Sequence, residues 1–409
     1  MIHSDNDRYV HVALPGRTDF VVAGRFRVSE TDRDGPLGEF VYERSYLTRR
    51  GAVELDPVQL RLTEHVRRTR SCHGLFGALR DATPETWGVL QVLSDGNVCY
   101  GKNRPARGPR DHAGAIVVTR GSESPRPKRR FKTIDDLDQL QTVVGATLEK
   151  LDARQETGTP RALEPPVIRR PTATVADGRT LWLAKFAQDQ AVWNHARIRH
   201  ATLQLGQACG LDTACSRVES THGQDILLLR RADREWMGDG YTCRRVISGR
   251  TLVSTLDKPA EQRWSYLALA DEIRRVSSCP RKDLRELFGR ICFNAAISNL
   301  DDNLDPPAMI AKGRGWRLTP ASGLAPTPLP EGEGGNLVMI CGPGGCSPSR
   351  ENIVSGAGRF LLDRPTAEAV FTRISVTVQA SWYAVMRRCG VSERDCELVA
   401  RSIVPGDAR

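Results

Sequence analysis

The chain has 409 residues, of which 40% are hydrophobic and 26% charged, and its formal net charge is +10. This composition is typical of a globular protein, and the length exceeds what one ordinary core fills, so two or three subdomains are expected. No apolar run approaches the roughly 18 residues that a membrane span needs. Residues 1–10 also lack an apolar leader, so the sequence predicts a cytoplasmic protein without membrane contact.

The eleven cysteines are scattered singly and their number is odd. This distribution favours buried, reduced thiols over a disulfide framework. The closest pair, Cys341 and Cys346, has no second pair or histidine at zinc-site spacing, so we do not expect a metal there.

Short apolar runs alternate with Gly, Pro and Asp over the first hundred residues, a pattern that predicts antiparallel strands in a β-rich subdomain. The proline-rich residues 102–132 carry much of the positive charge. A solvated linker explains such a run, and a nucleic-acid-binding face is the alternative. Residues 134–151 then have helical periodicity behind Thr133, a candidate N-cap.

Residues 172–234 read as two strands, a helix and two further strands. The first two strands form a hairpin that turns at Asp177 and Gly178, and the amphipathic helix is closed by Gly210. This order is typical of the ATP-binding lobe of a kinase. Beyond residue 251, helical periodicity over residues 260–276, 284–298 and 367–388 predicts a helical lobe.

Residues 292–328 hold the candidate site. An apolar helix is predicted to end at Asn299, and Asp301 and Asp302 follow in a tight loop. A short strand at residues 316–318 leads into a second loop, and two loops that meet at one cleft are typical of phosphoryl transfer. The alternative is that the two aspartates cap a helix end or a turn.

These loops resemble those of HipA-like proteins, the serine/threonine kinase-fold toxins of two-component toxin–antitoxin systems. Family members show Asn-Thr-Asp-Asp-His-x-x-Asn and Ser-Pro-x-Tyr-Asp-Leu-x-Pro, where residues 299–306 read NLDDNLDP and residues 319–326 read TPASGLAP. Other resembling segments follow in the family's order, at residues 38–42, 75–88, 114–118, 181–186 and 225–234.

The resemblance implies an α+β, protein-kinase-related fold with three parts. Residues 1–133 are expected to form a β-rich N-terminal subdomain with a basic linker. Residues 134–234 are expected to form an ATP-binding-type lobe, and residues 235–409 a helical C-terminal lobe.

The resemblance also implies site residues and cofactors. Asp301 falls on the catalytic base, and Lys185 falls on the lysine that positions the phosphates of ATP. A lysine on the solvent face of its strand is the alternative for Lys185. Arg231 and Asp233 lie in the segment that resembles the hinge, so cofactor binding is expected of them. ATP and Mg²⁺ are the cofactors if the protein is active.

Several positions depart from the family pattern. Pro306 stands in place of a metal-binding Asn and Gly323 in place of a metal-binding Asp, which leaves Asp302, Asn303 and Asp305 as the candidate metal ligands.

Two further departures concern the nucleotide itself. Residues 167–172, VIRRPT, lack the glycines with which backbone amides surround phosphates. Arg199 stands where the family places a glutamate that pairs with the strand lysine.

We therefore expect a HipA-family, kinase-like toxin component whose transfer of phosphate from ATP is impaired. The alternative is an inactive pseudokinase that serves as a protein-binding platform or as a basic, nucleic-acid-associated adaptor. The resemblance implies a helix-turn-helix antitoxin as partner, and operator DNA through that partner.

Overall fold

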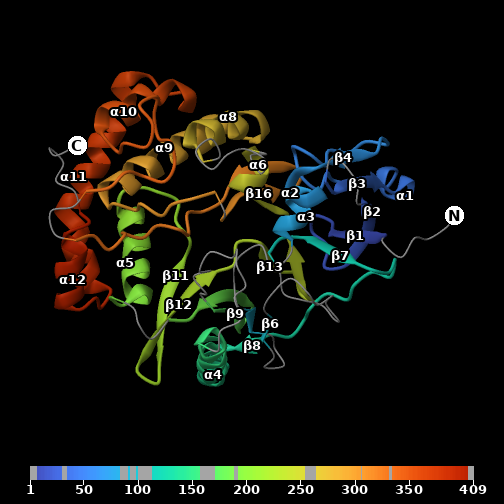
Figure 1. The fold of residues 1–409 in the computed structure, drawn as a ribbon, viewed down its shortest axis with the longest axis horizontal. Helices are drawn as coiled ribbons and strands as arrows, with labels where there is room; N and C mark the ends of the chain where they lie inside the picture. Colours follow the sequence, from blue (N-terminus) through green and yellow to red (C-terminus); the bar gives the residue numbers. More distant parts are fainter. Residues whose placement is uncertain are drawn as a thin grey trace.

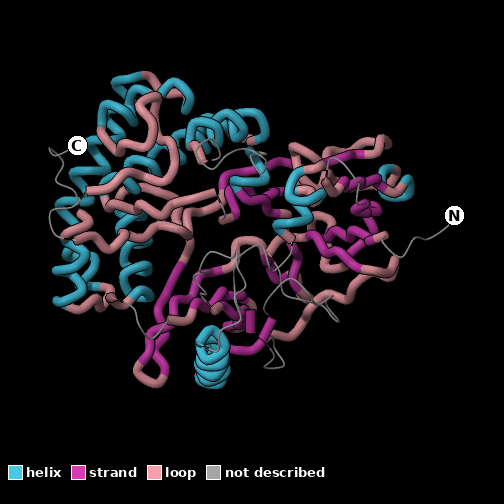
Figure 2. The backbone as a smooth tube through the Cα atoms, viewed as in Figure 1, coloured by secondary structure: helices cyan, strands magenta, loops and turns pink. Residues whose placement is uncertain are grey.

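The computed structural model describes residues 7–29, 35–82, 91–92, 98–99, 113–156, 171–187, 192–253, 264–304, 306–330 and 334–403. It is an α+β protein in which two sheets and a helical part lie side by side (Figure 1). Figure 2 shows most helices gathered on the side of the molecule where the C-terminus lies, and most strands in the middle and on the side of the N-terminus. No helix in the described part of the chain is long and apolar enough to cross a membrane.

The first sheet has the order β4-β3-β2-β1-β7, and each neighbouring pair is antiparallel, as predicted for a β-rich N-terminal part. Its strands are β1 (Arg8–Ala13), β2 (Phe20–Ser29), β3 (Leu37–Tyr42), β4 (Arg67–Thr69) and β7 (Ile116–Thr119). Short helices flank it, namely α1 (Arg44–Leu47), α2 (Ser71–Gly74) and α3 (Gly77–Asp81). Phe26, Phe40 and Phe76 pack edge to face in its core.

A buried carboxyl lies in the segment between α1 and β4. Asp56 is 0% exposed, and its Oδ1 accepts hydrogen bonds from the backbone N–H groups of Val58, Gln59 and Leu60. Its Oδ2 is buried and has no partner among the described residues. Burial outweighs the three backbone donors and raises the pKa of Asp56 from 3.8 to about 6.

This pKa predicts a pH-dependent stability. The folded protein holds the Asp56 proton more tightly than the unfolded chain, so the free energy of unfolding decreases as the pH rises through 4 to 6. A shift of about two pKa units corresponds to about 3 kcal/mol. We expect Asp56→Asn to abolish this part of the pH dependence. Urea denaturation of both proteins between pH 4 and pH 8 measures it, and equal slopes would contradict the assignment.

The second sheet has the order β11-β12-β10-β9-β5-β6, with β8 beside β9. Its strands are β5 (Gln91–Val92), β6 (Val98–Cys99), β8 (Lys132–Thr133), β9 (Thr172–Asp177), β10 (Thr180–Lys185), β11 (Ser216–Thr221) and β12 (Gln224–Arg230). The predicted hairpin is confirmed, because Asp177 pairs with Thr180 and Gly178 has φ +55°.

One helix packs on each face of this sheet. Thr133 caps a 3-10 turn, η2 (Ile134–Asp136), which leads into α4 (Leu137–Glu156), so the predicted helix start is confirmed. Leu137, Leu140 and Val144 of α4 form a small core with Trp182 and neighbouring sheet residues. On the other face, α5 (His195–Ala208) begins at the N-cap Asn194 and ends just before Gly210, whose φ is +80°.

The C-terminal part is mainly helical. Its helices are α6 (Gly249–Val253), α8 (Tyr266–Val276), α9 (Pro280–Ala296), α10 (Arg350–Ser355), η3 (Ala357–Phe360), α11 (Arg364–Arg388) and α12 (Glu393–Ala400). A hairpin precedes it, formed by β13 (Arg234–Trp236) and β14 (Tyr241–Cys243), and a small sheet lies within it, formed by β15 (Val246–Ser248), β16 (Pro307–Lys312) and β17 (Gly315–Leu318).

The helix before the predicted site differs in its bounds from the sequence prediction. It begins at Pro280, since proline at the first turn needs no hydrogen-bond partner for its nitrogen. It ends at Ala296 and not at Asn299, because Ser298 adopts a left-handed conformation with φ +48°. This turn redirects the chain and places the aspartate loop directly after a buried helix.

Candidate functional site

The first loop follows α9 and exposes one of its two aspartates. Asp301 is exposed, and its carboxylate has no hydrogen-bond partner within the described ranges. The side chain of Asn303 donates from Nδ2 to the backbone oxygen of Asp301 at 3.1 Å, which fixes the turn. An exposed carboxylate at this place can accept a proton from a hydroxyl group.

The second aspartate belongs to a closed hydrogen-bond network. Asp302 Oδ2 accepts from the hydroxyl of Tyr266 and from Asn294 Nδ2, the latter at 2.8 Å. Asn294 Nδ2 also donates to Tyr266 Oη at 3.1 Å. Burial raises the pKa of Asp302 even though these donors favour its ionised form. One oxygen of this carboxyl is therefore already used by the protein.

The second loop touches the first through an asparagine. Asn299 Nδ2 donates to Asn294 Oδ1 at 3.0 Å and to the backbone oxygen of Gly323 at 3.3 Å. A Cβ built on Gly323 would lie 3.8 Å from Asp302 Oδ1, which is an ordinary contact distance. The predicted meeting of the two loops is confirmed by these contacts.

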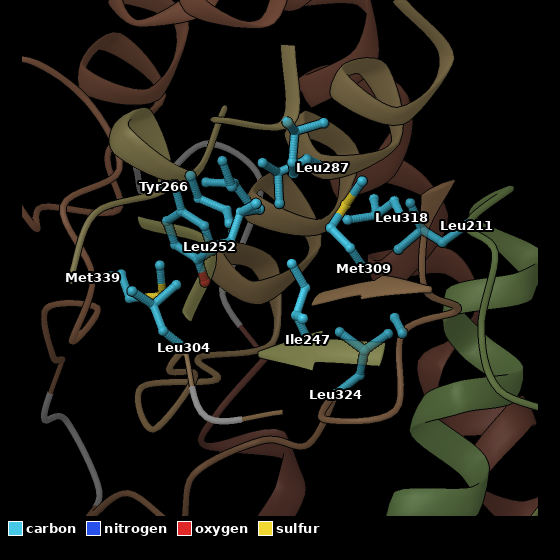
Figure 3. Close-up of a cluster of buried hydrophobic side chains, with 14 of the residues drawn as sticks. Leu211, Ile247, Leu252, Tyr266, Leu287, Leu304, Met309, Leu318, Leu324 and Met339 are labelled. Atoms are coloured by element: carbon cyan, nitrogen blue, oxygen red, sulfur yellow. The ribbon is translucent and has the colours of Figure 1, made fainter. Parts of the chain in front are cut away.

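Both loops also insert a leucine into the core. Leu304 of the first loop is 2% exposed and Leu324 of the second is 3% exposed. Figure 3 shows Leu304 beside Tyr266 and Met339, and Leu324 near the opposite end of the same cluster. The positions of the loops are therefore set by packing as well as by hydrogen bonds.

Residues later in the chain also form hydrogen bonds to the first loop. Thr327 donates from its backbone nitrogen to Ser298 O at 3.0 Å, and its hydroxyl oxygen accepts from Leu300 N at 2.9 Å. Ser402, which is 0% exposed, donates from Oγ to Thr327 O at 2.6 Å. Val338 N donates to Leu300 O at 3.2 Å. The first loop is thus fastened by residues far along the chain.

Lys185 lies on the side of its sheet that faces α5. Side chains alternate along a strand, and Trp182 and Ala184 belong to the core under α4. Lys185 therefore shares the opposite face with Leu183 and with its cross-strand neighbour Leu227, both of which pack in the main core. This is the face that a phosphate-positioning lysine needs. Because α5 contains no carboxylate, the helix supplies no anionic partner for Lys185, and Arg199 lies on this same helix.

Arg231 and Asp233 form a joint between three parts of the chain. Arg231 binds Asp233 through two hydrogen bonds of 3.0 and 2.8 Å and donates to Thr174 Oγ1 of β9 at 3.0 Å. Asp233 also accepts from Gly114 N at 2.8 Å and from Arg234 at 2.7 Å. Although burial opposes ionisation, the two guanidinium groups hold the pKa of Asp233 well below its usual range. Cofactor binding by Arg231 and Asp233 stays a prediction, and their observed contacts are with each other and with neighbouring segments.

Of the three candidate metal ligands, the structure describes Asp302 and Asn303. Asp305 and residues 167–170 lie outside the described residues, and Pro306 has no side-chain oxygen. Among the residues that the structure describes, no group of three or more His, Cys, Asp or Glu side chains could hold a metal. With one oxygen of Asp302 occupied and glycine at 323, the described residues do not fit the Mg²⁺ that ATP chemistry requires.

Sequence reasoning missed the residues that organise the site, namely Tyr266, Asn294, Asn299, Thr327 and Ser402. Asn294 gave the only visible signal, because it interrupts an otherwise apolar stretch of helix. A buried amide in such a place needs hydrogen-bond partners. Which partners it finds depends on the tertiary fold.

A sheet lobe joined to a helical lobe, with two loops meeting at their junction, defines an α+β fold of the protein-kinase-related type. The family model described as HipA-like C-terminal domain matches residues 147–382, which is more than half of the chain. The chain belongs to this family. The predicted resemblance is therefore confirmed.

A solved structure agrees on the fold. The chain is similar to HipA in the structure titled Shewanella oneidensis MR-1 Toxin Antitoxin System HipA, HipB and its operator DNA complex, with TM-score 0.59 and 14% identity over 93% of this chain and 92% of that chain. The proinflammatory kinase CtkA of Helicobacter pylori aligns with TM-score 0.34 and 8% identity over 53% of this chain and 94% of that one. No curated protein matches the sequence.

Proposed function

We propose that the protein is the toxin-side component of a toxin–antitoxin pair and that its transfer of phosphate from ATP to serine or threonine is impaired. The observation that carries this proposal is the junction of the two loops. The loops are assembled by Asn299, yet the second loop has glycine where a carboxylate would hold a metal. Among the described residues, the site thus keeps its scaffold and lacks a second-loop carboxylate that could hold a metal.

Residual transfer, if any remains, depends on Lys185 and Asp301. Lys185 would contact phosphate oxygens from the sheet, and Asp301 would accept the proton of the attacking hydroxyl. The side chains of a kinase site act together, so the loss of several members lowers the rate by many powers of ten.

The partner we propose is a helix-turn-helix antitoxin, and through it operator DNA. Support comes from the family and from the similar HipA, whose structure contains HipB and operator DNA. In this role the protein acts as a binding platform that does not need catalysis. Co-expression with a helix-turn-helix protein encoded beside its gene should give a stable complex on gel filtration, and failure to co-elute would contradict the pairing.

Calorimetric titration with ATP tests the catalytic part of the proposal. We expect magnesium to increase the affinity for ATP by less than about twofold, because no second-loop carboxylate is available to bind it. Lys185→Ala should then lower the affinity for ATP by the same factor with and without magnesium. Magnesium-dependent binding that Lys185→Ala abolishes would overturn the proposed impairment, and a kinase assay with an Asp301→Asn control would follow.

A further inference from the structure

A basic connector, which we define as residues 120–132, joins the two sheets. It leaves β7 of the first sheet and enters β8 of the second, and it has no regular structure before Lys132 (Figures 1 and 2). Its cations are Arg120, Arg126, Lys128, Arg129, Arg130 and Lys132, and its one acid is Glu123.

Four arginines of this connector are exposed and have no ion-pair partner among the described residues. Arg120, Arg126, Arg129 and Arg130 are exposed, and none of them makes an ion pair within the described part of the chain. Arg275, by comparison, is exposed and pairs with Glu272. Unpaired surface guanidinium groups in one short stretch repel one another, so an anionic partner would relieve this repulsion.

The connector is nevertheless held in place. Phe131 packs edge to face on Tyr241 of β14 with ring centroids 5.6 Å apart, and Lys128 lies 4.6 Å above the Phe131 ring. Lys132 pairs with Asp136 at 3.3 Å. Pro125 and Pro127 restrict the backbone further. Binding therefore requires little additional ordering of this segment.

We propose that the basic connector binds the phosphodiester backbone of a nucleic acid without sequence preference. The planar guanidinium fork matches phosphate oxygens, which makes arginine suited to this contact. From Arg120 to Arg130 the chain can span up to roughly 36 Å, so the four arginines can each reach a different phosphate, since these are spaced about 3.4 Å along one strand. A membrane surface is disfavoured, because the one large apolar side chain of the connector, Phe131, packs on Tyr241.

The test is a salt titration of binding by the full-length protein to a 30-base-pair DNA duplex of arbitrary sequence. Four phosphate contacts predict a slope of log K against log salt of about −3.6, or roughly a 100-fold loss of affinity between 50 and 200 mM salt. Replacing the four unpaired arginines with Gln should flatten this slope. Lys128 is kept, because it covers Phe131.

A matched variant controls for net charge. Its four Arg→Gln changes are at exposed positions whose arginines are paired with Asp271, Glu272 or Glu368, namely Arg274, Arg275, Arg359 and Arg364. Both variants lower the formal charge from +10 to +6 (10 − 4), so only the connector variant should lose binding. Equal binding by the two variants would overturn the proposal. Stronger connector-dependent binding to anionic phospholipid vesicles or to polyglutamate than to DNA would also overturn it.

Discussion

Replacing Gly323 with aspartate is expected to increase the affinity for ATP in magnesium tenfold or more, which is about 1.4 kcal/mol. A Cβ at this position meets nothing closer than Asp302 Oδ1 at 3.8 Å, so a side chain can start there without a clash. The new carboxylate would stand near Oδ1 of Asp302, and carboxyl oxygens close together are what Mg²⁺ prefers. Calorimetry with and without magnesium measures the gain.

The control for this experiment is Gly323→Asn, which has the same size and no charge. Without a metal, the new carboxylate lies near Asp302 and repels its ionised form, so the aspartate variant should unfold at a lower urea concentration than the asparagine variant. With magnesium, the aspartate variant should instead unfold at a higher urea concentration than the asparagine variant. If both variants respond to magnesium alike, the glycine at position 323 is not what limits metal binding.

Replacing Asn294 with alanine is expected to lower the free energy of unfolding by about 3 kcal/mol. Asn294 is 1% exposed. Its side-chain amide donates to Asp302 and Tyr266 and accepts a hydrogen bond from Asn299. Its removal leaves buried polar groups without partners, which costs far more than the loss of an exposed hydrogen bond. Urea denaturation at pH 8 measures the loss.

The pH dependence of this loss identifies the group responsible. The ionised form of Asp302 needs the amide donor most, and its pKa is already raised in the folded protein. The loss should therefore be smaller below the raised pKa of Asp302, where the carboxyl has taken up a proton, than at pH 8. Asn303→Ala, in the same loop, is the matched control and should cost less than about 0.5 kcal/mol at either pH. An equal loss in both variants would contradict the network.

The sequence allowed accurate prediction where local chemistry decides the structure. The hairpin at Gly178, the helix closed by Gly210 and the start at Thr133 were all predicted, because turn and capping residues act on their immediate neighbours. The sequence prediction put the end of α9 too late. Ser298 has a left-handed conformation and accepts a hydrogen bond from Thr327, which is far along the chain, so no local pattern predicts this end.

The candidate site was predicted only in part for the same reason. Lys185 and Asp301 could be named from their motifs, and alternation along β10 puts Lys185 on the α5 face. The network around Asp302 joins Tyr266 and Asn294 over 36 and 8 residues, so no local pattern predicts it. For Arg231 and Asp233, the sequence could suggest a hinge but could not show that their charges pair with each other.

The bond between Ser402 and Thr327 has a consequence for the timing of assembly. These residues are 75 positions apart, and Thr327 in turn holds the backbone of Leu300. At the usual rates of protein synthesis, roughly 4 to 15 s pass between the appearance of the two residues. The aspartate loop thus stays incompletely fastened while the ribosome makes the helices that follow it. A nascent chain reaches its final loop geometry only after translation of α12, so its surface becomes recognisable to a conformation-specific partner late in synthesis.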